Sequence, residues 1–177
     1  MKYKLTDETT TTNTGIVLHR IECVTAFSGV KVGEKGGWIE REENISQCDN
    51  CWVYGDAFVY GNARVCGDAL VCDNAQVYGN ARVYGDALVY GDTLVCENAQ
   101  VYGNAVIGNS NDYIVFKNNW SSGRHFTWTS SNDMWKVGCF YGTGKELIEK
   151  AYKDSKLSGD CYKAYVELVE KLKEIQK

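Results

Sequence analysis

A six-residue repeat runs through the middle of the chain and constrains its fold more than any other feature. A valine or isoleucine recurs at every sixth position from Val53 to Ile107, and an alanine or threonine follows four residues after each valine up to Val101. Asp or Asn precedes the small residue, usually after Gly, so the unit reads V-x-G-[DN]-A-x. A period of six fits neither an amphipathic helix nor a hairpin array. It predicts a coil of short strands, with valine and the small residue inward and the Gly–Asp/Asn pair at a turn.

Three such units close a triangular coil, so the structural period is eighteen residues. Leu70 and Leu88 begin successive coils on this count, and Asn62, Asn80 and Asn98 stack at one corner. Residues that flank an inward valine point outward, because side chains alternate along a strand. Each outward position therefore belongs to one of three faces that can be assigned from the numbering alone.

The repeat resembles the hexapeptide-repeat family, which implies a left-handed parallel β-helix against the usual preference for right-handed crossovers. The segment Gly36-Gly37-Trp38-Ile39-Glu40, followed by Glu43 to Ser46, is similar to the lead-in of hexapeptide proteins common in bacterial and phage genomes. The best-known family members are trimeric acyltransferases that use acetyl-CoA or acyl carriers. The resemblance thus implies a fold directly, and a trimer and acyl transfer as family expectations.

The flanking segments differ in composition from the repeat, and the sequence predicts a mainly β protein in three parts. Residues 1–52 form an N-terminal strand, at 16–24, and a cap of the β-helix, which occupies residues 53–110. Residues 111–177 form a small α+β segment, with strands at 113–120, 124–129 and 134–141 and two helices. A capping box from Thr143 to Glu146 opens the first helix, and Ser158–Gly159 is expected to break it from the second.

The first outward face carries no charge. It presents Trp52, Leu70, Leu88 and Val106. A continuous apolar face of this size is not expected to face water in a monomer. The C-terminal segment covers it, or it is the interface of a homo-oligomer, with a trimer preferred from the family resemblance.

The third outward face places Arg64 and Arg82 one above the other, beside Tyr84 and Tyr102. Two arginines about 4.8 Å apart repel each other unless an anion or a carboxylate lies between them. The guanidinium fork suits phosphate, so a nucleotide-like ligand is expected here. The alternative is a solvated face neutralised by turn aspartates such as Asp68 and Asp86. A second, weaker candidate set for the same kind of ligand is Arg124 and Lys145.

Candidate catalytic residues are few. Family acyltransferases generally use a histidine as general base, and the two histidines here, His19 and His125, lie outside the repeat. His125 is a weak candidate, expected instead to be an exposed strand residue. Cys48 and Cys51 have the spacing of a metal pair, but the repeat frame points one thiol out and the other in, so no metal site is expected.

The net charge of −4 argues against broad nucleic-acid binding, and no apolar run is long enough to span a bilayer. The absence of a signal sequence predicts a cytoplasmic protein with eight reduced cysteines. The preferred interpretation is a non-catalytic binding protein without a cofactor. It would sequester a nucleotide-like anion or block a host protein, as a phage counter-defence protein does. The alternative is an acyltransferase that uses acetyl-CoA.

Overall fold

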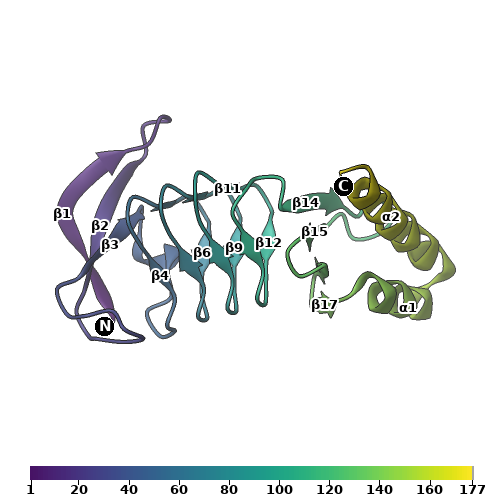
Figure 1. Ribbon diagram of the computed structural model, residues 1–177, viewed down its shortest axis with the longest axis horizontal. Helices are drawn as coiled ribbons and strands as arrows, with labels where there is room; N and C mark the ends of the chain where they lie inside the picture. Colours follow the sequence, from purple (N-terminus) through teal and green to yellow (C-terminus); the bar gives the residue numbers. More distant parts are fainter. Residues whose placement is uncertain (177) are drawn as a thin grey trace.

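The protein is elongated, with three parts arranged in a line (Figure 1). A computed structural model describes residues 1–176. An N-terminal antiparallel sheet lies at one end, the coil occupies the middle, and a small sheet with two helices lies at the other end.

Two-residue strands stack along the coil in three parallel sheets, one for each face. The first face holds β4 (Trp52–Val53), β7 (Leu70–Val71), β10 (Leu88–Val89) and β13 (Val106–Ile107). The second holds β5 (Phe58–Val59), β8 (Gln76–Val77) and β11 (Leu94–Val95), and the third holds β6 (Arg64–Val65), β9 (Arg82–Val83) and β12 (Gln100–Val101). Each residue pairs with its counterpart eighteen positions on, as Leu70 does with Leu88. The predicted parallel β-helix is confirmed, with about four turns because the first face stacks four strands.

The interior of the coil contains the inward valines and small residues, each at most 1% exposed. Thr93 takes an alanine position and is equally buried. Most turns between faces carry a glycine with positive φ, and Asp73 and Glu97 adopt the same conformation at two of them. Gly67 has a φ of +74°, and a Cβ there would lie 2.9 Å from the backbone nitrogen of Gly85 in the next coil. Any side chain at this corner would push neighbouring coils apart.

The N-terminal end of the coil is covered by the three-stranded sheet of β1 (Tyr3–Thr11), β2 (Val17–Cys23) and β3 (Lys35–Ile39). β3 runs parallel to β5 and extends the second face into this sheet. Gly36 and Gly37 allow β3 to lie close to the first strand of the coil, because a Cβ on either glycine would lie within 2.6 Å of an atom of Val53. The predicted strand at 16–24 corresponds to β2, whereas β1 was not predicted because its sequence is mostly polar and exposed. A short 3₁₀ turn, η1 (Glu42–Asn44), leads into the coil.

The C-terminal end is covered by a second antiparallel sheet, of β14 (Tyr113–Lys117), β15 (His125–Thr129), β16 (Met134–Val137) and β17 (Phe140–Gly142). The single strand predicted at 134–141 is two strands, because Gly138 adopts a φ of +55° and turns the chain. Phe126 and Trp128 pack toward the helices. Thr127 and Thr129 are also buried, at 1% and 3% exposure, so the side of this strand expected to face water lies against the protein.

Hydroxyl groups that follow the repeat supply the hydrogen-bond acceptors that a further coil would have provided. Each strand of the coil begins with a backbone N–H that donates to the following coil, as Leu70 N donates to Ala87 O at 2.9 Å. On the last level, Gln100 N donates to Thr127 Oγ1 at 2.9 Å and Val106 N to Ser131 Oγ at 2.8 Å. Leu94 N donates to Ser110 Oγ. One hydroxyl on each face thus satisfies a donor that the end of the repeat would leave open.

The two helices are α1 (Gly144–Asp154) and α2 (Lys156–Ile175). The predicted capping box is confirmed, since Thr143 Oγ1 accepts from Glu146 N and the Glu146 carboxylate accepts from Thr143 N. The predicted break at Ser158–Gly159 is wrong. Ser155 separates the helices and caps α2 by accepting from Ser158 N. Gly159 lies inside α2, where a Cβ would lie 2.2 Å from the Tyr152 ring, so glycine here allows the two helices to pack closely.

None of the helices in residues 1–176 is both long and apolar enough to cross a membrane. All eight cysteines lie within the described residues and are free thiols. Cys51 points inward and is fully buried while Cys48 is exposed, as the repeat frame predicted. Burial raises the pKa of the Cys51 thiol to about 11, which keeps it protonated at neutral pH.

We expect Val77→Asp to unfold the coil, because Val77 is fully buried and an unpaired carboxylate there costs several kcal/mol. Circular dichroism should show loss of the β signal or a much lower melting temperature. Gln76→Asp is the matched control, since Gln76 lies on the same strand and points outward. A Val77→Asp protein that melts like its control would contradict the inward valine column.

Candidate functional site

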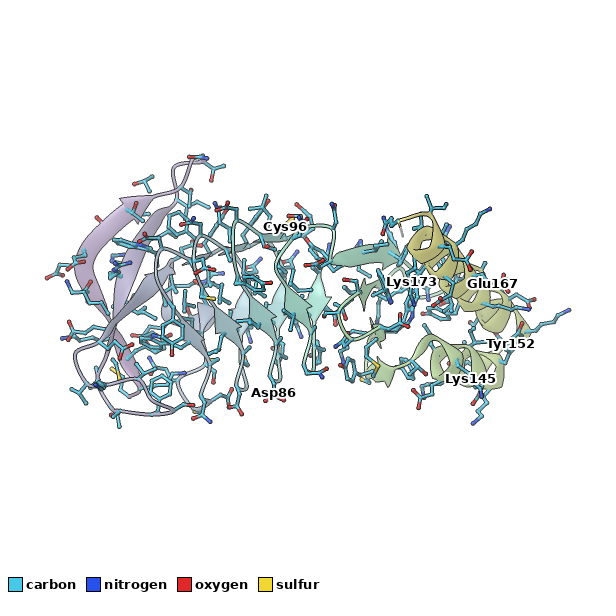
Figure 2. The ribbon with its side chains drawn as sticks, in the orientation of Figure 1. Asp86, Cys96, Lys145, Tyr152, Glu167 and Lys173 are labelled. Carbon is cyan, nitrogen blue, oxygen red and sulfur yellow. The ribbon has the colours of Figure 1, made fainter. Side chains whose placement is uncertain are left out.

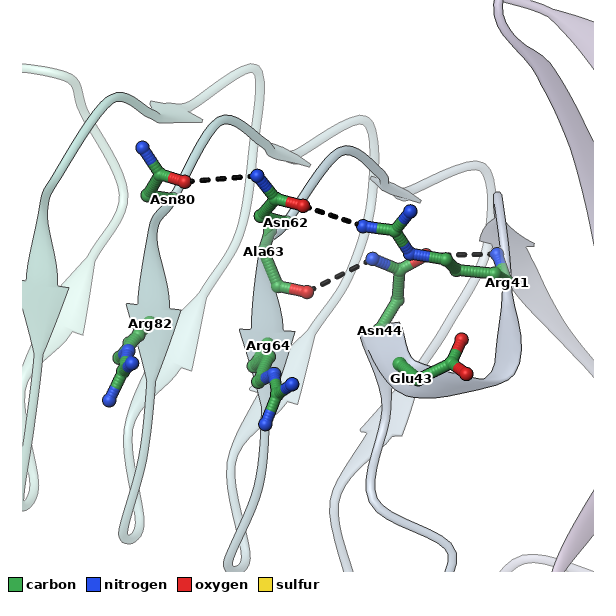
Figure 3. Close-up of a pocket in the computed structure, with 8 residues that line it drawn as sticks. All are labelled: Arg41, Glu43, Asn44, Asn62, Ala63, Arg64, Asn80 and Arg82. Carbon is green, nitrogen blue, oxygen red and sulfur yellow. Dashed lines mark hydrogen bonds between the residues drawn. The ribbon is translucent and has the colours of Figure 1, made fainter.

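A cavity of about 500 Å³ opens on the third face, where the coil meets η1 (Figure 3). Its wall contains three arginines, Arg41, Arg64 and Arg82, and one carboxylate, that of Glu43. Asn44, Asn62, Ala63 and Asn80 complete the lining. The side chains of Arg64 and Arg82 project in the same direction from neighbouring strands. The two arginines predicted to lie together therefore do so, in a concave site.

A ladder of amides forms one edge of this cavity. Asn62 Nδ2 donates to Asn80 Oδ1 at 3.1 Å, and Asn80 Nδ2 donates to Asn98 Oδ1 at 3.5 Å. Arg41 begins the ladder by donating to Asn62 Oδ1 at 2.8 Å and to the carbonyl of Gly61. Asn44 is buried and donates to the carbonyl of Ala63 at 3.0 Å. The Arg41 guanidinium is therefore held in place, and the ladder has one direction along the coil.

Arg64, Arg82 and Arg124 have no such partners. Among the described residues, no ion pair or side-chain hydrogen bond involves the guanidinium of Arg64, Arg82 or Arg124, and all three are exposed. The turn aspartates do not neutralise them, since Asp68 instead accepts from Asn50 at 2.9 Å. Stacked guanidinium groups without carboxylates attract an anion from solution. Asp68 is thus not paired with these arginines, and an ordinary solvated face remains the alternative to an anion site.

A second cavity, of about 510 Å³, adjoins the first on the same face. The two share Asn80 and Arg82. The second is also lined by Asn98, Gln100, Arg124, His125 and Gly138. Because β15 lies against β12 at the end of the coil, Arg124 and His125 come to the arginine face from the C-terminal segment. Arg124 and His125 were candidates from the sequence, but no sequence pattern indicated that they lie beside Arg82.

Tyr84 and Tyr102 stack on each other with ring centroids 5.0 Å apart. They lie on the same face as the arginines but line neither cavity. The ammonium group of Lys136 lies 4.1 Å from the centroid of Tyr102, and burial lowers the pKa of Lys136. The nearby positive charge of Arg82 offsets part of the rise that burial causes in the tyrosine pKa values. The tyrosines thus border the arginine site as neighbours and line neither cavity.

A family model described as the YdcK β-solenoid repeat matches residues 57–73, 75–91 and 81–97. The coil is a hexapeptide-repeat β-helix. A relative named "Uncharacterized acetyltransferase YdcK", from Escherichia coli (strain K12), is 32% identical over 84 residues. The match covers 40% of this chain and 26% of the relative, so the chain spans about a quarter of that protein.

Lys145 does not join the arginines of the hexapeptide β-helix. It is exposed on α1, at the helical end of the molecule (Figure 2), and lines neither cavity. Arg124 lines one cavity with Arg82 and another with Lys150 of α1, and Lys145 lines neither, so the structure does not bring Arg124 and Lys145 together.

Only part of the apolar first face of the hexapeptide β-helix is accessible for contact with another chain. Trp52 is fully buried beneath the N-terminal sheet, with Phe27 at a ring centroid distance of 5.5 Å and Tyr3 at 6.0 Å. Trp52 was predicted to be an interface residue, and this is wrong because the chain's own cap covers it. Leu70 and Leu88 are half-buried, and Val106 is 38% exposed. The C-terminal segment covers the end of the coil rather than this face.

Two residues of the first cavity, Arg41 and Asn44, escaped the sequence analysis. They lie before the regular repeat, where Ile45 bridges to Val65, a spacing of twenty rather than eighteen. The eighteen-residue count still places Asn44 level with Asn62, and Asn44 donates to the flanking carbonyls of Gly61 and Ala63, whereas Arg41 lies outside that count. The signal that could have found them is the degraded Asn–Ile unit at 44–45, which continues the Asn and inward-residue positions of the coil.

Proposed function

We propose that this protein binds a small phosphate-bearing anion on the third face of its β-helix, in the cavity of Arg64 and Arg82. The observation that carries this proposal is the pair of stacked, exposed arginines without a carboxylate partner, set in a concave wall. Arg offers a planar fork that matches phosphate oxygens, and the amides of Asn62 and Asn80 add neutral polar groups. For this set of binding groups we propose a non-catalytic protein that sequesters a nucleotide-like ligand.

We expect Arg82→Ala to weaken binding of a nucleoside monophosphate about tenfold or more, since a hydrogen bond to a charged group contributes roughly 1.5–3 kcal/mol. Calorimetry with a panel of nucleotides measures this, and Arg64→Ala should give a similar loss. Lys145→Ala removes the same charge away from the cavity and should leave affinity unchanged. Failure of the wild type to bind any phosphate compound would refute the proposal and leave a protein as the better candidate partner.

The second candidate function is acetyl transfer. Two observations favour it: the relative's name, and the position of His125 in the same cavity as Arg82 and Gln100. His125 is half-buried and would take a proton from an acceptor hydroxyl or amine within hydrogen-bond reach of a ring nitrogen. Acetyl-CoA would supply the acetyl group, and its phosphates are anions that the neighbouring arginines could bind.

If acetyl transfer occurs, His125→Ala should reduce the rate about a hundredfold or more, because general-base catalysis typically contributes that much. Release of free CoA thiol from acetyl-CoA with a panel of amines and sugars measures the rate. His125→Gln retains hydrogen bonding and controls for loss of binding. Equal rates for His125→Ala and the wild type would exclude His125 as the base.

We also propose that the first face mediates self-association through Leu70, Leu88 and Val106, with a trimer preferred. Leu70→Glu combined with Leu88→Glu should dissociate the assembly, because like charges would replace apolar contacts. Light scattering measures the mass, and Leu94→Glu on the second face is the matched control. A wild-type protein that is monomeric at micromolar concentration would contradict this proposal.

A further inference from the structure

The two cavities on the third face adjoin, and we call the pair the trough. They meet at Asn80 and Arg82, which line both cavities. Arg64 lies one coil before Arg82, and Arg124 comes from the sheet that covers the coil beyond it. The trough therefore offers three unpaired guanidinium groups in sequence along the axis of the coil.

The two ends of this trough differ in charge. The first cavity has the Glu43 carboxylate in its wall, and its third arginine, Arg41, already donates to Gly61 O and Asn62 Oδ1. The second cavity contains no carboxylate among its lining residues. Besides Arg82, Arg124 and His125, the lining of this cavity contains only side-chain amides and a glycine. The positive charge of the second cavity is thus not offset by a lining carboxylate, so this cavity can take a second anion besides the one proposed at Arg64 and Arg82.

The amide ladder points its donors toward this end. Arg41 donates to Asn62, Asn62 to Asn80, and Asn80 to Asn98, so every amide accepts from the N-terminal side and donates onward. Hydrogen bonds arranged in one direction polarise one another. Asn98 ends the ladder, and its Nδ2 group is the donor that remains for the second cavity, whose wall Asn98 forms.

We infer that the ligand carries two phosphate groups, one held by Arg64 and Arg82 and the other by Arg82, Arg124 and Asn98. This inference rests on the proposed function and extends it from a single phosphate to a pair. Neighbouring coils are about 4.8 Å apart, so the two groups lie about one coil apart along the axis. Phosphates at this separation occur in an oligophosphate chain and in adjacent nucleotides.

The test uses inorganic tripolyphosphate and orthophosphate, measured by calorimetry at fixed ionic strength. Arg124→Ala should weaken tripolyphosphate about tenfold or more, and should change orthophosphate by less than about twofold. Arg64→Ala should also weaken tripolyphosphate about tenfold. Lys145→Ala is the control for loss of one positive charge at the same end of the molecule. The melting temperature of each variant should match the wild type, because the three substituted side chains are exposed.

The same variants distinguish the source of the phosphate pair and separate this inference from the proposed function. ATP binding more tightly than a 5′-phosphorylated diadenylate would support an oligophosphate chain, and the reverse would support adjacent nucleotides; both depend on Arg124 if the inference holds. An Arg124→Ala protein that loses nothing, or loses the same factor for orthophosphate and tripolyphosphate, would overturn the phosphate pair. The proposed function would survive that result if Arg82→Ala still weakened orthophosphate. It would fail with the inference if no phosphate compound bound the wild type.

Discussion

Hydrogen bonding between one coil and the next, over a column of buried valines, supports every other feature of the molecule. Each face contributes only two strand residues per coil, so a single coil could not bury its own interior. Stacking solves this, because Leu70 N reaches Ala87 O and Tyr54 N reaches Val71 O at 2.9 and 2.8 Å. The inward valines then touch those above and below. Since the same contacts recur at eighteen residues, the register is fixed and the outward side chains form columns.

A stack of this kind has two open ends, and the chain closes them in different ways. At the start, β3 pairs with β5 and converts the parallel face into an antiparallel sheet, while Trp52 fills the space beneath it. At the finish, hydroxyl groups of Ser110, Thr127 and Ser131 take the backbone donors of the last level. Edges with unpaired backbone groups invite association with other chains. The two closures cover the ends of the coil, and the second also places Arg124 and His125 on the arginine face.

The sequence predicted those parts of the structure that the repeat controls. The three faces, the stacked pair of Arg64 and Arg82 and the asparagine ladder follow from a period of eighteen. The capping box of α1 follows from local chemistry that a short segment contains. The cover over Trp52 could not be predicted, because β1 is mostly polar and carries no clear strand pattern. Nor could the place of Arg124, because it depends on how the last sheet docks on the coil, a long-range contact that no periodicity encodes.

The number of repeat units also determines which face of the coil the C-terminal segment contacts. Each six-residue unit advances the chain by a third of a turn, so the sheet that bears Arg124 and His125 meets the arginine column only if the number of units differs from the present one by whole coils. Loss of eighteen residues would keep that alignment and bring Arg124 one level nearer to η1. Loss of six would turn the sheet to another face, where those residues would no longer meet the arginine column. Evolution can therefore lengthen or shorten such a chain by whole coils and keep a trough of this kind. Gain or loss of a single unit would place the residues that line the trough on different faces.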